Sequence, residues 1–119
     1  MPPSNQTVGK EGEDLACNFL KKNGYRIIEQ NFKKKHGDID IVALDGDTLV
    51  FVEVKARRSK QYGPAAEAIT PWKIKMLIQS AHLYKMFHPK LPESLRIDVV
   101  AIDYTEKMPR IELIKNITM

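Results

Sequence analysis

Two segments that alternate polar and apolar residues, 38–44 and 48–55, constrain the fold more than any other part of the chain. Between them lies an Asp-Gly pair at 45–46, which is typical of tight hairpin turns. The middle of the second segment is apolar without interruption, and this indicates a strand covered on both faces. Its last charges, Glu53 and Lys55, need partners because burial of an unpaired charge is costly. The sequence therefore predicts a hairpin whose second strand lies inside a sheet.

The length of the hairpin loop decides which side chains meet, because residues directly opposite in an antiparallel pair share a face. A four-residue loop pairs Leu44 with Leu49. That register places Asp40 directly opposite Glu53, whereas a two-residue loop leaves the two acids diagonal. A three-residue loop moves Asp40 to the other face. Strict alternation predicts two faces for the first segment, with Asp38, Asp40, Val42 and Leu44 on one and Ile39, Ile41 and Ala43 on the other.

Either even-length loop gathers Asp40, Glu53 and Lys55 on one face, as metal-dependent phosphodiester cleavage requires. At cross-strand distances of roughly 5 to 8 Å the two carboxylates can share one divalent cation. Carboxylates hold Mg²⁺ or Mn²⁺ while leaving positions for water and phosphate. Lys55 can then orient the attacking water or stabilise the charge of the transition state. The alternative is an ion pair of Lys55 with Glu53 or Asp40 at a sheet edge.

Length and composition favour one domain, expected over residues 9–119, with a loose tail at 1–8. The chain has no run of 18 apolar residues, and its start is polar, so we expect no membrane partner. Cys17 is the only cysteine, which fits a reducing cytoplasm and a buried small residue. The formal net charge of +4 neither requires nor excludes a polyanionic partner.

Basic residues flank the acidic hairpin, and this pattern suits a DNA phosphate backbone approaching metal-binding acids. The alternative is a solvated surface rich in lysine. Tyr62 is expected to line the DNA groove, whereas Trp72 is expected to pack in the core or at its rim. The residues expected to bind nucleic acid are Lys33, Lys34, Lys35, Arg57, Arg58, Tyr62 and Lys73.

The remaining pattern predicts a mixed α/β sheet with helices packed on it, in the order α-β-β-β-α-β-β. Outside the hairpin, helices are expected at 9–23 and from Thr70-Pro71 to Pro89, and strands at 25–32, 95–103 and 110–114. Glu13 lies at the edge of the apolar stripe of the first helix. It can reach a site at the helix–sheet boundary or remain a surface residue. Asp98 can pair with Arg96 or lie near the site, and we expect it to be structural.

Five stretches, GEDLACNFL, GDIDIVA, LVFVEVKAR, YGPAAEAI and LRIDVVAID, closely resemble the YraN-like family of uncharacterised bacterial proteins. That family is similar to archaeal Holliday junction resolvases of the restriction-endonuclease-like superfamily. The resemblance covers about residues 9–104 and implies a restriction-endonuclease-like fold. It also implies a Mg²⁺-dependent DNA endonuclease acting on branched DNA, for which a two-fold junction favours a homodimer.

In this resemblance Asp40 corresponds to the superfamily's motif aspartate, and Glu53 and Lys55 fill its E-x-K motif. Glu13 corresponds to the acidic residue that resolvases present from their first helix, so it becomes a further catalytic residue and metal ligand. Ile39 stands where the superfamily has a proline. Fold transfers more safely than reaction, so two alternatives stay open. One is a nucleic-acid-binding protein with a weak or inactive site, and the other is a metal-binding structural protein.

Overall fold

The computed structural model of the chain describes residues 9–34, 37–59 and 69–118, and of Lys34 only the backbone. These residues form two helices and five strands, which confirms the predicted order α-β-β-β-α-β-β. Most boundaries differ from the prediction by one or two residues. The elements are α1 (Gly9–Lys22), β1 (Arg26–Lys34), β2 (Gly37–Asp45), β3 (Thr48–Arg57), α2 (Pro71–Phe87), β4 (Ser94–Asp103) and β5 (Arg110–Ile114).

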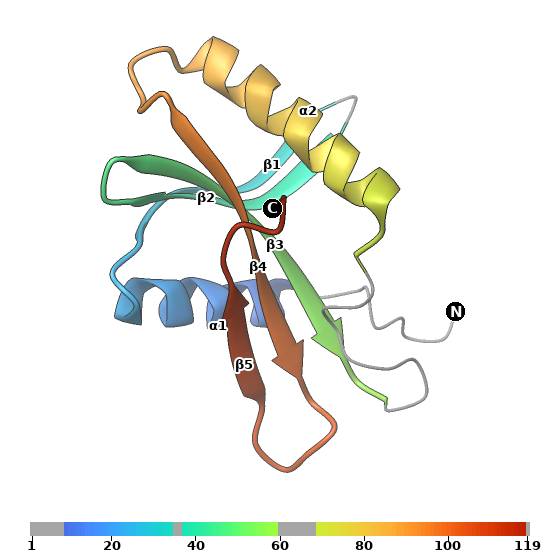
Figure 1. Cartoon of the computed structure of the whole chain (residues 1–119). Coiled ribbons are helices and arrows are strands. Elements are labelled where there is room, and N and C mark those ends of the chain that lie inside the picture. Colours follow the sequence, from blue (N-terminus) through green and yellow to red (C-terminus); the bar gives the residue numbers. More distant parts are fainter. Residues whose placement is uncertain (1–8, 35–36, 60–68, 119) are drawn as a thin grey trace.

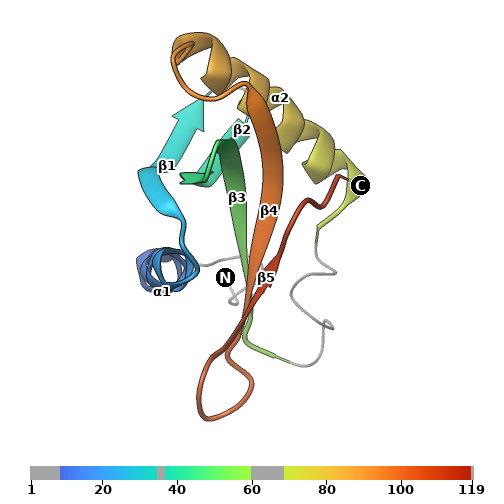
Figure 2. The same ribbon diagram turned by 60° about the vertical axis from the view of Figure 1, so that its left-hand side comes forward.

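The five strands form one mixed sheet in the order β1-β2-β3-β4-β5. Only β3 and β4 are parallel, and α2 lies in the connection between them. The other neighbours are antiparallel. Helix α1 covers one face of the sheet and α2 the other (Figures 1 and 2). Strand β3 occupies the centre, and all its residues except the two terminal ones are buried, as its apolar run predicts.

Each helix closes its own hydrophobic core against the sheet. The core under α1 includes Ala16, Cys17 and Leu20 with Ile41, Ala43, Val50, Val52 and Val54. The core under α2 includes Leu77, Ala81 and Tyr84 with Phe32, Ile39, Val42, Leu49 and Phe51. Because Val50 and Phe51 fall in different cores, adjacent residues of β3 alternate between the two helices, as the period of a strand requires. Cys17 is buried, as expected.

Local signals in the sequence define the ends of both helices. Thr70 caps α2, and its Oγ1 accepts a hydrogen bond of 3.1 Å from the backbone N–H of Lys73. Pro71 occupies the first turn, where its missing N–H costs nothing. Helix α1 is followed by Gly24 at φ +90°, a left-handed conformation that glycine adopts without strain. No helix among the described residues is long and apolar enough to cross a membrane.

The register of the hairpin corresponds to the longer of the two even loops, with Leu44 paired to Leu49. One further pair, Asp45 with Thr48, shortens the turn to Gly46-Asp47. The prediction that Ile39 shares a face with Ile41 and Ala43 was wrong. Ile39 packs in the core under α2, whereas Ile41 packs under α1.

This reversal has a local cause in β1. Asn31 and Asp40 fall between the ladder pairs Gln30–Ile41 and Phe32–Ile39, and Asn31 has φ +57°, a conformation outside the regular strand range. Its neighbour Phe32 pairs with Ile39, and both turn toward α2. The backbone therefore changes direction at Asn31 and Asp40, and the strict period of two does not continue past them.

Trp72 does not pack in the core, contrary to the prediction. Trp72 is 68% exposed and lies on the first turn of α2. The apolar stripe that contacts the sheet begins two residues later, at Ile74, and continues through Leu77 and Ala81. At 100° per residue, Trp72 lies away from that stripe, which explains its exposure.

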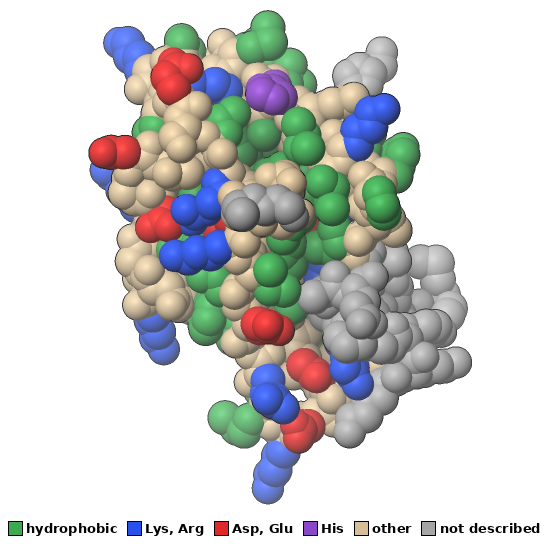
Figure 3. All heavy atoms as spheres, in the orientation of Figure 1, with side chains coloured by type: hydrophobic (Ala, Val, Ile, Leu, Met, Phe, Trp, Pro, Cys, Tyr) green, Lys and Arg blue, Asp and Glu red, His purple; other side chains and the backbone are tan. Residues whose placement is uncertain are grey.

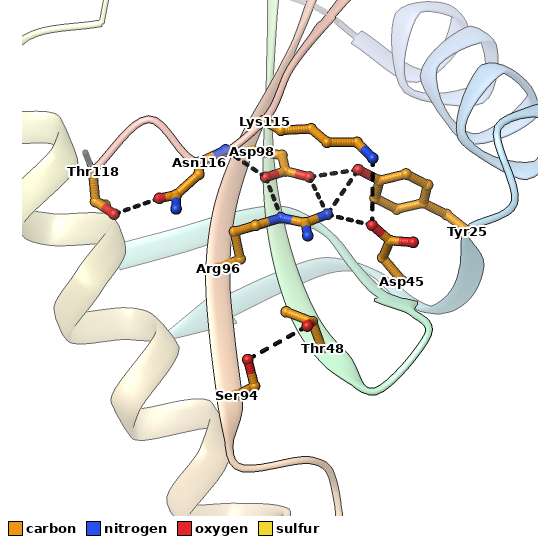
Figure 4. A network of polar contacts seen from close by, with 9 residues as sticks. All are labelled: Tyr25, Asp45, Thr48, Ser94, Arg96, Asp98, Lys115, Asn116 and Thr118. Atoms are coloured by element: carbon orange, nitrogen blue, oxygen red, sulfur yellow. Dashed lines mark hydrogen bonds and ion pairs between the residues drawn. The ribbon is translucent and has the colours of Figure 1, made fainter.

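A buried polar network ties β4 to three other parts of the chain (Figure 4). The fully buried Asp98 accepts hydrogen bonds from the Tyr25 hydroxyl at 2.6 Å and from the Arg96 guanidinium at 2.9 Å. It also accepts one from the backbone N–H of Asn116 at 2.9 Å. Arg96 extends the network to Asp45 at 2.6 Å. The expectation that Asp98 is structural and paired with Arg96 is confirmed.

Loss of the Asp98 carboxylate should destabilise the fold strongly. Asp98→Ala leaves the Arg96 guanidinium and the Tyr25 hydroxyl without their buried acceptor, which should cost about 3–5 kcal/mol of unfolding free energy. Urea denaturation of the two proteins measures the difference. The control is Glu106→Ala, which removes a surface ion pair with Arg110 and should cost less than about 1 kcal/mol. Equal effects of the two substitutions would contradict this role.

Candidate active site

The predicted acidic residues lie where β2 separates from β3. The ladder between these strands runs from the turn to the pair Ile41 and Val52. Beyond this point the backbone N–H of Val54 donates instead to Oδ2 of Asp40, at 2.8 Å. A buried backbone N–H needs an acceptor, and here a side chain replaces the strand. The hydrogen bond fixes the Asp40 carboxylate against the central strand.

Glu53 is 3% exposed and lies one residue before Val54, on the face of β3 that is covered by α2. Its Oε2 lies 3.6 Å from Nζ of Lys55 and 3.5 Å from Nζ of Lys73. The ion pair considered as an alternative is thus present, but on the central strand and not at a sheet edge. One carboxylate is held by two ammonium groups, and one of these comes from the first turn of α2.

The Asp40 and Glu53 carboxylates are close enough to influence each other's charge. Burial raises the pKa of Glu53 to about 7, and the negative charge of Asp40 and a hydrogen bond with it act in the same direction. Lys73 and Lys55 oppose this shift without cancelling it. Near neutral pH Glu53 is therefore partly protonated. Two adjacent carboxylates that retain a proton can exchange it for a cation, which removes the same repulsion.

Glu13 approaches Asp40 from α1. Its Oε1 is buried without a hydrogen-bond partner in the described part of the chain. Burial raises its pKa, the charge of Asp40 raises it further, and a hydrogen bond with Asn31 lowers it. A buried carboxylate oxygen without a hydrogen-bond partner lowers the stability of the folded protein. Glu13, Asp40 and Glu53 thus form a chain of electrostatically coupled acids.

Asn31 is a residue of this site that the sequence analysis missed. It lies on β1, between the residues paired with Ile39 and Ile41, and its side chain forms a hydrogen bond with Glu13. A signal was present, since asparagine is disfavoured inside strands and is one of the few residues that tolerate φ > 0. The sequence predicted Lys73 only as a nucleic-acid contact, whereas the structure places its ammonium group on Glu53.

A divalent cation such as Mg²⁺ could be held by the carboxylates of Glu13, Asp40 and Glu53. All of its donors are carboxylate oxygens, the ligands that Mg²⁺ prefers. Across 9–34, 37–59 and 69–118, no three or more His, Cys, Asp or Glu side chains form a group arranged to hold a metal ion. Mg²⁺ is commonly bound by one or two carboxylates, with water and phosphate at the remaining positions. Asp40 and Glu53 can supply these two carboxylates, and Glu13 has a buried oxygen without a hydrogen-bond partner beside Asp40.

The other basic residues expected to bind nucleic acid lie in different settings. Lys33 and Arg58 are exposed, and the Arg58 guanidinium lies 4.5 Å from the centre of the Tyr104 ring. Arg57 is partly buried, with Nη1 at 3.9 Å from Oδ2 of Asp103. The side chain of Lys34 and all of Lys35 and Tyr62 lie outside the described residues. Of this set, Lys73 contacts an acid of the site.

Comparison with known proteins places these residues in a family. The profile described as "Uncharacterised protein family UPF0102" matches residues 12–102, from α1 through β4. The chain belongs to the UPF0102 family. This confirms the relationship to the YraN-like bacterial proteins, and the UPF0102 match spans Glu13, Asp40, Glu53 and Lys55.

UPF0102 relatives cover nearly the whole chain. One from Herminiimonas arsenicoxydans is 50% identical over 103 residues, which are 87% of this chain and 82% of the relative. One from Syntrophus aciditrophicus is 46% identical over 113 residues, 94% of this chain and 88% of the relative. One from Geobacter metallireducens is 42% identical over 112 residues, 94% and 92% of the two chains. The protein therefore corresponds to most of the length of these relatives.

The metal-free protein should become less stable as pH rises from about 5 to about 7. Folded Glu53 keeps its proton up to about pH 7, whereas the unfolded chain releases it near 4.5. The contribution of the Glu53 proton to stability is therefore fully present below pH 4.5, and up to about 3 kcal/mol of it is lost as pH rises from 4.5 to about 7. The raised pKa of Glu13 acts in the same direction. Denaturation in EDTA between pH 5 and 8 measures the slope.

Glu53→Gln should remove most of this slope, because the amide stays neutral throughout the range. Glu112→Gln, at an exposed position on β5, is the matched control and should retain the wild-type slope. A wild-type protein with equal stability at pH 5 and pH 8 would contradict the assignment of a raised pKa to Glu53.

Proposed function

We propose that the protein is a Mg²⁺-dependent endonuclease that hydrolyses phosphodiester bonds in DNA, with branched DNA as its preferred substrate. The observation that carries the proposal is the pair of carboxylates, Asp40 and Glu53, where β2 leaves β3, with Lys55 at 3.6 Å from Glu53. A bound Mg²⁺ would neutralise phosphate charge and lower the pKa of the attacking water. The preference for branched DNA comes from the resemblance to resolvases.

Each residue of such a site would have a separate role. Asp40 accepts a hydrogen bond from the Val54 N–H through Oδ2, and this bond positions the carboxylate that would hold the cation. Glu53 contacts both lysines through Oε2, and its carboxylate would hold the cation together with Asp40 once the proton shared with Asp40 is displaced. The Lys55 ammonium can stabilise negative charge on the phosphate in the transition state. Glu13 would accept a hydrogen bond through its buried Oε1 from a water bound to the cation.

A second candidate function is nucleic-acid binding without cleavage. The burial of Glu53 favours this function. The residue is 3% exposed, and Lys55 and Lys73 both contact its Oε2. The Lys73 ammonium occupies space beside the carboxylate that a cation would use. A protein in which this contact persists would bind DNA through its basic residues and leave the phosphodiester intact.

Metal should stabilise the protein through Asp40. At about 100 times its dissociation constant, Mn²⁺ adds about 2.7 kcal/mol, a rise in melting temperature on the order of 10 °C. Asp40→Asn keeps an acceptor for the Val54 N–H and removes one of the repelling charges. The metal-free variant should therefore match or exceed wild type in stability and lose most of the response to Mn²⁺. Thermal melts with and without Mn²⁺ measure both quantities.

The control for this experiment is Asp14→Asn, which removes an exposed acid of α1 that pairs with Lys10. It should keep the full response to Mn²⁺. If Asp40→Asn destabilises the metal-free protein and leaves the metal response intact, Asp40 is structural and the proposed site loses its first ligand.

Cleavage should depend on Lys55, whereas binding should not. Wild type with Mn²⁺ should cut a labelled four-way junction faster than a linear duplex of the same sequence, and Lys55→Met should be slower by about 10²-fold or more. The control Lys107→Met, at an exposed position between β4 and β5, should cut normally. Binding of the junction in Ca²⁺ should weaken with salt, with a log–log slope of about −0.9 for each phosphate contact.

These measurements separate the two functions. Salt-dependent binding without cleavage, in both Mg²⁺ and Mn²⁺, supports the binding protein and rejects the nuclease. Replacement of Lys33, Lys34 and Lys35 by glutamine should flatten the salt slope under either function. An unchanged slope would return these lysines to a solvated surface without a DNA contact.

A further inference from the structure

Trp72 is the only tryptophan in the chain, and it lies at the surface beside the candidate active site. It is 68% exposed on the first turn of α2 and belongs to neither hydrophobic core. The residue that follows it, Lys73, has its Nζ 3.5 Å from Oε2 of Glu53. An aromatic ring that is open to solvent is therefore one residue away from a group that contacts the site.

The helix that carries Trp72 is basic. Lys73, Lys75 and Lys85 lie on α2, and none of its 17 residues is an Asp or a Glu. Hydrophobic and basic side chains are exposed together near the start of α2 in Figure 3. Lys75 is exposed and follows Trp72 by three residues, a spacing at which side chains are neighbours on the surface of a helix. The indole and an ammonium group thus occupy neighbouring positions.

The surface around Trp72 matches the chemistry of a nucleic acid. A helix with three lysines and no acid favours a polyanionic partner. An exposed indole favours a partner with flat aromatic faces, on which it can stack. A DNA strand offers both groups within one nucleotide, a base for Trp72 and a phosphate for Lys75.

We propose that the Trp72 indole stacks on a base that the DNA leaves unstacked next to the phosphate bound at the candidate active site. The inference rests on the proposed function for the presence of DNA, and it holds whether or not the DNA is cleaved. Lys73 connects Trp72 to the acids, since its ammonium group contacts Glu53. A strand whose phosphate lies at Glu53 therefore passes the start of α2.

Stacking on Trp72 would give the site a preference for irregular DNA. In a regular duplex each base is already stacked between its neighbours, and moving one out of the stack costs free energy. At a bulge, a single-stranded end or an open branch point, a base lacks its partner or a stacked neighbour, so it can reach the indole without that cost. Because every base has an aromatic face, this contact selects the shape of the DNA and not its sequence.

The fluorescence of Trp72 measures the stacking directly, because the chain has no other tryptophan. The probes are a short DNA duplex with one unpaired thymine, the same duplex with an abasic nucleotide in place of that thymine, and the fully paired duplex. Each is titrated into the wild-type protein in Ca²⁺. At saturation the duplex with the unpaired thymine should quench the tryptophan emission strongly, and the other two should quench it little.

Substitutions separate the stacking contact from the phosphate contacts. Binding is measured by the fluorescence anisotropy of labelled DNA. Trp72→Ala should bind the duplex with the unpaired thymine about 5- to 100-fold more weakly and the fully paired duplex nearly as well as wild type does. Trp72→Phe should retain most of the affinity. Lys75→Ala should weaken binding of all three duplexes alike, because a phosphate contact does not depend on the unpaired base.

The matched control is Met86→Ala, at a residue that is 75% exposed near the other end of α2, and it should bind all three duplexes as wild type does. Wild type that binds the duplex with the unpaired thymine without quenching overturns the stacking and leaves the proposed function intact. Equal losses of affinity by Trp72→Ala for the paired and the thymine-bulged duplex do so as well. Wild type that binds none of the DNAs overturns the stacking together with the proposed function. The abasic comparison uses wild type alone, so it tests the proposal even if Trp72→Ala fails to fold.

Discussion

The hydrogen bond from the Val54 N–H to the Asp40 carboxylate holds the candidate site together. Strand β3 is buried on both faces, so each of its backbone donors must find an acceptor as β2 diverges. A side-chain carboxylate supplies that acceptor and is thereby fixed one residue from Glu53. The position of the acid pair thus follows from the hydrogen-bonding needs of the sheet. It does not require a separate loop built to hold it.

Two buried acids on adjacent strands show how differently a sheet can use the same functional group. Asp98 accepts hydrogen bonds from a hydroxyl, a guanidinium and a backbone N–H, so its charge is fully compensated. Glu53 instead faces another acid, and two lysines at 3.5 and 3.6 Å compensate it incompletely. A satisfied acid stabilises the fold. A buried acid with incomplete charge compensation, such as Glu53, lowers the stability of the fold, and such acids are common at functional sites.

Short sequence patterns predicted the helices and strands well. The hairpin follows from alternation around Asp-Gly, and the start of α2 follows from Thr70 and Pro71. The reversal of Ile39 could not be predicted in this way, because it depends on the left-handed backbone of Asn31 in a neighbouring strand. The contact between Lys73 and Glu53 spans twenty residues and depends on how α2 lies across the sheet. Spacing alone does not encode such an arrangement.

The unequal pairing of β3 has a mechanical consequence. Toward β4 the strand is paired along all ten of its residues, from Thr48 to Arg57, whereas toward β2 the pairing stops at Val52. Glu53 and Lys55 therefore belong to the rigid half of the sheet. Asp40 belongs to an arm that is joined to that half, beyond the last ladder pair, by its hydrogen bonds with the Val54 N–H and with Glu53. Beyond Val52 the separation of the two acids is therefore set by side-chain hydrogen bonds and by the packing of Ile39 under α2, and the backbone ladder does not fix it.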